Sequence, residues 1–191
     1  MADLHQRSAT TQKDRLDVTT DVRIAVLGIG NVLMLDEGLG PRVVAELNAR
    51  VEFPPGVEVL DRATMGMALL AEMPAWDVML VIDAVDNTGL APGTVLSFAP
   101  EDIAAQQVFH GAHDTRFSDV LQAAALLGYQ VEGHCLGAQV ANMAPADYQI
   151  GLTPAVEAAL PLLMHAALDF LAQRGVRAVD RKSGRAWDGE R

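Results

Sequence analysis

Cysteine, basic residues and long apolar runs are all scarce in this sequence. The 191 residues include one cysteine, Cys135, so neither an internal disulfide framework nor a zinc-ribbon site can form. Lys and Arg number 14 against 25 Asp and Glu, which gives a formal net charge of -11. Nucleic-acid binding requires a basic footprint, and we therefore expect no nucleic-acid partner.

Membrane-spanning patterns are also lacking. No apolar run approaches the ~18 residues that a span requires, and the N-terminus has no apolar signal-peptide core. We expect no membrane insertion. We also expect a cytoplasmic location, because thiols stay reduced in the cytoplasm and the chain has a single cysteine. A composition of 50% hydrophobic and 20% charged residues excludes a disordered chain.

The length predicts one domain with a substantial core. Residues 1–21 are polar and without apolar periodicity, so they predict a flexible N-terminal arm. Residues 177–191 have the same character and predict a flexible C-terminal tail. The folded domain should therefore cover residues 22–176, and we expect it to be a monomer.

Apolar runs of strand length alternate with helical patterns inside this domain. The most apolar run, 77–86, predicts the central strand. The alternation predicts a single three-layer α/β domain, with a mostly parallel, twisted five-stranded sheet and helices on both faces. The predicted strands are 23–28, 57–61, 77–86, 93–100 and 130–141; the predicted helices are 41–50, 64–73, 118–128 and 153–175, the last kinked at Pro161.

Ligands of open α/β sheets bind outside the carboxyl ends of the strands, so the loops there hold the candidate site. Gly28 and Gly30 follow the first strand as in a dinucleotide-binding fingerprint, but Leu33 occupies the place of its third glycine. Asp36 and Glu37 then precede a helix and would repel a pyrophosphate. This pattern disfavours nucleotide binding.

Glu37, Asp83 and His113 should share one edge of the sheet. Two carboxylates and an imidazole suit a divalent transition-metal ion, or equally a metal-free acid–base cluster. Structural roles are also open: Glu37 can complement a helix dipole, and Asp61, which ends the second strand, can cap a turn. His134 and Cys135 are adjacent on a strand and point to opposite faces, so they cannot form a nucleophile–base pair.

Five motifs in order resemble the [NiFe]-hydrogenase maturation endopeptidases: GIGNVLMLDEGLGPRVV, DRATMGMALL, VIDAVD, GAHDTRFSDVL and IGLTPAVEA. The resemblance covers about residues 23–175. It implies an α/β domain that removes the C-terminal extension of the hydrogenase large-subunit precursor after nickel insertion. The continuation after His113, which reads Asp114-Thr115-Arg116, departs from the family pattern, and the stretch 137–149 is longer than usual.

The resemblance also implies roles for particular residues. Glu37, Asp83 and His113 match the family's metal-binding residues, and Asp61 matches an aspartate beside its cleft; we expect these four to be catalytic. We expect no resident cofactor: nickel would arrive with the substrate, and Zn or Cd could replace it in vitro.

Catalysis could use either the ion or a nearby carboxylate to activate water. No GxSxG elbow or HExxH helix is present. Two rival interpretations are a non-catalytic nickel-binding maturation chaperone and, less compatible with the charge, an RNA-directed hydrolase.

Overall fold

The structure is a computed structural model that describes residues 22–99, 102 and 117–187. A five-stranded sheet in the order β3-β1-β4-β6-β5 forms its centre. The strands are β1 (Ile24–Ile29), β3 (Val57–Ala63), β4 (Val78–Val85), β5 (Val95–Phe98) and β6 (Glu132–Gln139). β3, β1, β4 and β6 run parallel to one another, whereas the edge strand β5 runs antiparallel to β6. The mostly parallel sheet and its central strand β4 confirm the prediction.

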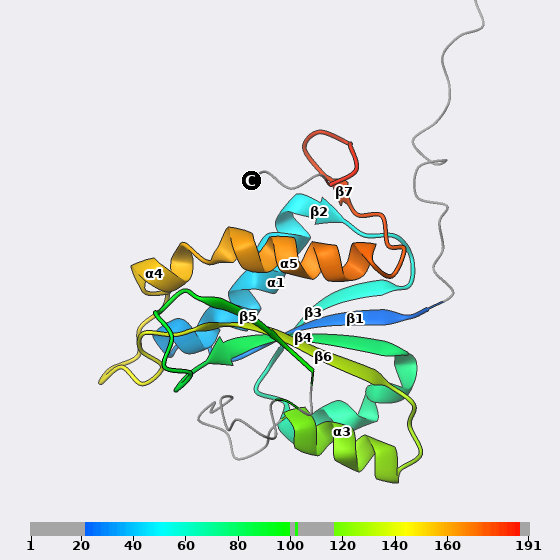
Figure 1. Ribbon diagram of the computed structural model, residues 1–191, viewed down its shortest axis with the longest axis horizontal. Helices are drawn as coiled ribbons and strands as arrows, with labels where there is room; N and C mark the ends of the chain where they lie inside the picture. The colour runs from blue at the N-terminus through cyan, green and yellow to red at the C-terminus, as the bar shows by residue number, and fades with distance from the viewer. Residues whose placement is uncertain (1–21, 100–101, 103–116, 188–191) are drawn as a thin grey trace, which may run out of the picture.

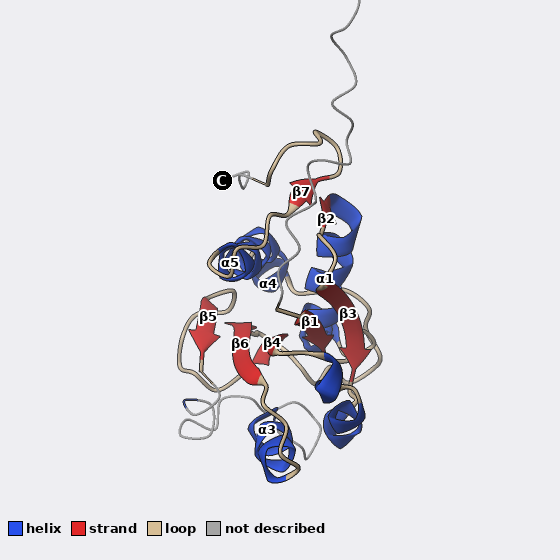
Figure 2. Cartoon of the chain, turned by 90° about the vertical axis from the view of Figure 1, so that its right-hand side faces the viewer, coloured by secondary structure: helices blue, strands red, loops and turns tan. Residues whose placement is uncertain are grey.

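Helices cover both faces of the sheet, which gives the predicted three layers (Figures 1 and 2). One face carries α1 (Leu39–Arg50), α4 (Pro154–Glu157) and α5 (Leu160–Ala172). The other face carries α3 (Phe117–Leu126) and the short 3-10 helices η3 (Gly66–Ala71) and η4 (Met73–Ala75). β4 is apolar at every position except Asp83 because it is covered on both sides: Leu80 and Ile82 pack with α1 and α5, and Met79 and Val81 pack with α3.

The predicted long C-terminal helix is two helices, α4 and α5, separated at residues 158–159. Pro161 explains the interruption, because it has no N–H and its ring excludes the carbonyl four residues earlier, at Glu157. The stretch Pro154–Ala172 is long and apolar enough to cross a membrane by length and composition, unlike what we expected. Half of it is buried inside the fold, and α5 packs over the sheet as a core helix does.

The sequence predicts a flexible tail over residues 177–191. In the structure, residues 177–187 are instead attached to the fold. Two-residue strands β2 (Val51–Glu52) and β7 (Val179–Asp180) pair antiparallel. The N–H of Trp187 donates to the carbonyl of Ala178 at 2.9 Å, and the indole packs against the larger core cluster. Docking of this polar segment depends on partners far away in the sequence, so local composition did not reveal it.

Candidate active site

The loop after β1 folds back tightly and places Glu37 beside the sheet. It ends in the 3-10 helix η2 (Leu35–Gly38), which leads directly into α1. Gly30 has a φ of +137°, and a Cβ there would lie 1.9 Å from the carbonyl oxygen of Glu37. A Cβ on Gly40 would lie 2.2 Å from the carbonyl oxygen of Ile82 in β4. These close approaches explain why glycine is required at both positions.

Asp36 holds this loop in place from within the protein. Its carboxylate is fully buried. Oδ2 accepts hydrogen bonds from the N–H groups of Ala141 and Asn142, both at 3.0 Å, and from the Thr153 hydroxyl at 2.9 Å. Oδ1 accepts from the Thr153 N–H at 2.7 Å. Asp36 therefore joins η2 to the segment after β6 and to the start of α4. The sequence did not predict this role for Asp36, because its hydrogen-bond partners lie more than 100 residues away along the chain.

Asp83 lies near the carboxyl end of β4, as predicted. Its side chain points to the face that carries α3, because it lies two residues beyond Val81. Desolvation by the surrounding protein raises the pKa of Asp83 to about 7 and outweighs the hydrogen bond from the Ala84 N–H at 2.7 Å, which lowers it. Repulsion from the negative charge of Glu37 raises it further.

Glu37 and Asp83 are thus brought together at the carboxyl edge of the sheet. Glu37 is only 2% exposed, and the electrostatic coupling of the two carboxyl groups contributes to the raised pKa of Asp83. Electrostatic repulsion between the two carboxylates favours protonation of one of them or a bound cation. The arrangement can therefore hold a divalent ion or transfer a proton near pH 7.

Asp61 occupies a different position. It follows Val59, which packs with α1, by two residues, so its side chain points to the face opposite that of Asp83. The carboxylate is exposed and accepts a hydrogen bond from the Ala63 N–H at 2.8 Å. This is the turn-capping role that the sequence left open for Asp61.

His113, the third predicted metal ligand, lies outside the described residues, as do His110 and Asp114. Within 22–99, 102 and 117–187, no three His, Cys, Asp or Glu side chains come together as a metal site. The described part of the site therefore consists of the carboxyl pair of Glu37 and Asp83.

Cys135 and His134 point to opposite faces of β6, as predicted. Cys135 is 1% exposed, and burial raises the pKa of its thiol well above the ordinary value. His134 hydrogen-bonds with the Ser97 hydroxyl at 2.9 Å and stacks on Phe170, with ring centroids 5.0 Å apart. Burial and the nearby Asp83 carboxylate keep the thiol protonated, and a protonated, enclosed thiol is not a nucleophile.

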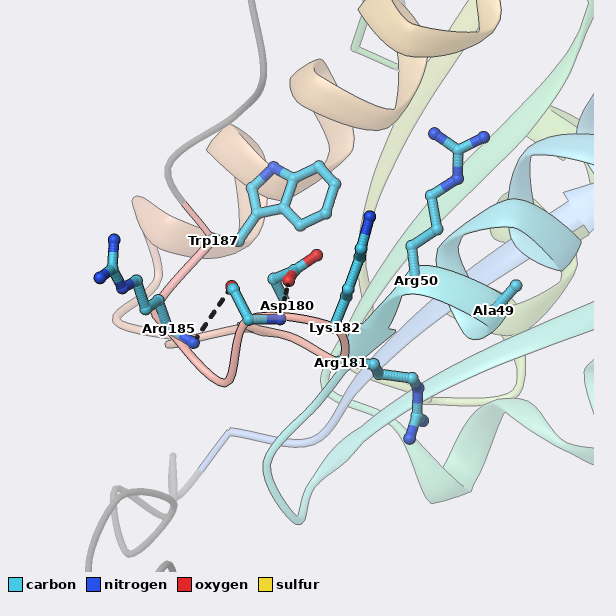
Figure 3. Close-up of a pocket in the computed structure, with 8 residues that line it drawn as sticks. Ala49, Arg50, Asp180, Arg181, Lys182, Arg185 and Trp187 are labelled. Atoms are coloured by element: carbon cyan, nitrogen blue, oxygen red, sulfur yellow. Dashed lines mark hydrogen bonds between the residues drawn. The ribbon is translucent and has the colours of Figure 1, made fainter.

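A surface pocket of about 940 Å³ lies at the other end of α1. The residues that line it come from the end of α1 and from the C-terminal segment, and they include Arg50, Lys182 and Trp187 (Figure 3). The pocket lies at Ala49 and Arg50, at the C-terminal end of the 12-residue helix α1, whereas η2 directly precedes its first residue; ten residues of helix lie between them, or about 15 Å along the helix axis. Arg50 is already paired with Glu46 at 2.8 Å. The pocket is therefore separate from the carboxyl pair.

The fold and the pair of Glu37 and Asp83 define an α/β protein with a carboxyl pair at the edge of its sheet. Comparison with known proteins identifies the family to which it belongs. The family model described as "Hydrogenase maturation protease" matches residues 41–170. The chain belongs to this family and is an endopeptidase. The matched range includes Asp61, Asp83 and His113, whereas Glu37 lies just before it.

Individual relatives agree with this assignment. The hydrogenase 2 maturation protease of Escherichia coli is 35% identical over 164 residues, which cover 85% of this chain and 98% of that protein. The hydrogenase expression/formation protein HoxM of Azotobacter vinelandii is 40% identical over 168 residues, covering 85% and 78%. Membership of a protease family disfavours the non-catalytic chaperone.

Solved structures agree as well. The hydrogenase maturating endopeptidase HybD from E. coli has a TM-score of 0.75 at 34% identity and covers 84% of this chain and 98% of its own. A hydrogenase maturation protease HycI from Thermococcus kodakarensis, at 19% identity and a TM-score of 0.65, shares the fold.

Proposed function

We propose that this endopeptidase removes the C-terminal extension of a [NiFe]-hydrogenase large-subunit precursor after nickel insertion. The observation that carries the proposal is the pair of Glu37 and Asp83, enclosed at the carboxyl edge of the sheet in a member of this family. Nickel held by the precursor would bind these two carboxylates, together with His113. The metal is then part of the substrate and not a resident cofactor.

Nickel recognition would make cleavage conditional on a completed metal centre. A loaded precursor relieves the repulsion between Glu37 and Asp83, whereas an empty precursor leaves the two carboxyl groups as they are. This difference in binding free energy favours the loaded form. If no ion is bound by Asp83, its pKa of about 7 suits it instead to hold or release a proton near neutral pH as water attacks the scissile carbonyl. Ion-activated water and carboxylate-activated water both fit this site.

The test compares nickel-loaded and nickel-free precursor with the purified full chain, and intact-mass spectrometry of the products is the readout. We expect cleavage of the loaded form alone. Equal cleavage of both forms would refute nickel recognition, and cleavage of neither would refute the processing role.

Variants assign the residues in the same assay. Glu37→Gln and Asp83→Asn should each reduce cleavage of the loaded precursor at least about 100-fold. Asp61→Asn is the matched control, because it removes an exposed carboxylate on the opposite face of the sheet and keeps the hydrogen bond of the turn. It should leave cleavage nearly unchanged. If Asp61→Asn reduced cleavage as much as Asp83→Asn does, Asp61 would also be a catalytic residue.

A further inference from the structure

Four exposed apolar side chains lie in the loop that leads to Glu37 and in the segment that pairs with this loop: Val32, Leu33, Tyr148 and Ile150. We call them the apolar patch. Val32 and Leu33 are 47% and 43% exposed, and Tyr148 and Ile150 are 79% and 80% exposed. Large side chains this exposed and this close together are typical of a surface that another molecule covers.

Backbone pairing joins the two halves of the patch, which are more than a hundred residues apart in the sequence. Met34 and Gln149 form a parallel bridge. The N–H of Gln149 donates to the carbonyl of Leu33 at 2.9 Å, and the N–H of Leu35 donates to the carbonyl of Gln149 at 2.8 Å. The pairing sets Tyr148 beside Leu33 along the bridge.

The same backbone continues into the candidate active site. The N–H of Glu37 donates to the carbonyl of Met34 at 3.2 Å, so the bridge residue also contacts η2. Asp36 binds Asn142 and Thr153, which lie before and after the residues 147–150. These hydrogen bonds hold the apolar patch at a defined position relative to Glu37. Its side chains are exposed even though the backbone that carries them is firmly attached.

We propose that the apolar patch binds the polypeptide substrate next to the segment that is cut. This inference rests on the proposed function and adds to it the surface that selects the substrate. An endopeptidase acts on a polypeptide, and a chain that places a bond at Glu37 and Asp83 must pass over the residues adjoining Glu37. Two carboxyl groups discriminate poorly between proteins, whereas an aromatic and aliphatic cluster provides the anchors typical of protein interfaces.

The chemistry of the patch also describes the complementary surface. Tyr148 and Ile150 require apolar side chains opposite them. The exposed Asp147 borders Tyr148, and the whole chain carries a net charge of -11. The substrate surface that fits is therefore an apolar cluster bordered by basic residues.

Steady-state kinetics on nickel-loaded precursor test the proposal, with the double variant Tyr148→Ser/Ile150→Ser against the unmodified chain. We expect KM to rise at least about tenfold while kcat changes less than about twofold, because binding is lost and the carboxyl pair is intact. Leu126→Ser is the matched control: Leu126 is 90% exposed and ends α3, away from the η2 loop. Tyr148→Phe keeps the ring and should keep KM.

Each outcome decides between alternatives. An unchanged KM in the double variant, or a fall in kcat alone, overturns the patch as the substrate-binding surface. Loss of a dimer in light scattering with KM unchanged would assign the patch to a second copy of this chain. Failure of the unmodified chain to cleave the precursor refutes the proposed function instead, and is seen before any variant is made. A thermal midpoint within a few degrees of the unmodified chain verifies that the double variant is folded.

Discussion

Desolvation of Asp83, together with repulsion from Glu37, should destabilise the protein when no cation is bound, and Asp83→Asn should reveal this as a pH effect. The pKa of Asp83 rises from 3.8 to about 7 through desolvation and repulsion from Glu37. Well below pH 3.8 the Asp83 carboxyl group is protonated in both the folded and the unfolded state, and its burial does not reduce the free energy of unfolding. Between pH 4 and 7 the folded state retains a proton that the unfolded state releases, so stability falls as pH rises.

The size of this effect follows from the shift. About 3 pKa units at 1.36 kcal/mol each correspond to about 4 kcal/mol as an upper limit. Solvent screening at the partly open side chain reduces it to about 2–4 kcal/mol. Asn has nearly the same shape and can still accept the hydrogen bond from the Ala84 N–H. Asp83→Asn should therefore raise the free energy of unfolding by about 2–4 kcal/mol at pH 8 and change it little at pH 4.

Urea denaturation between pH 4 and 8.5, with a chelator present, measures this difference. Because carboxyl groups remote from Asp83 titrate alike in both proteins, the difference curve isolates Asp83 together with its coupling to Glu37. Glu37→Gln removes only the repulsive contribution, so it should recover a smaller part of the loss. Parallel curves for the unmodified chain and Asp83→Asn across this range would refute the reasoning.

Three further perturbations test the rest of the site. Asp36→Ala removes a buried acceptor of four hydrogen bonds and should lower the free energy of unfolding by about 3–5 kcal/mol in urea denaturation; a loss under about 1 kcal/mol would contradict its role. Gly40→Ala places a Cβ 2.2 Å from the Ile82 carbonyl oxygen and should cost about 2–3 kcal/mol, whereas Arg42→Ala on the exposed side of α1 should cost under about 1 kcal/mol. Cys135 should react with a thiol reagent only after denaturation, and loss of cleavage in a folded Cys135→Ala protein would restore a thiol mechanism.

The sequence by itself determined the layers, the central strand and the edge that carries the carboxyl pair. A strand covered on both faces, such as β4, must be apolar over most of its length. A charged residue at its end, such as Asp83, therefore stands out. The helix interruption next to Pro161 is local in the same way, because the missing N–H acts on the preceding turn.

Only the tertiary structure decided which distant segments meet. The antiparallel direction of β5, the docking of 177–187, the hydrogen bonds of Asp36 and the pairing of Met34 with Gln149 join residues far apart in the chain. Likewise, the opposite faces of Asp61 and Asp83 follow from the strand to which each belongs. Periodicity and composition describe a residue and its near neighbours. Contacts between remote segments depend instead on which backbone groups and side chains are brought together when the chain folds.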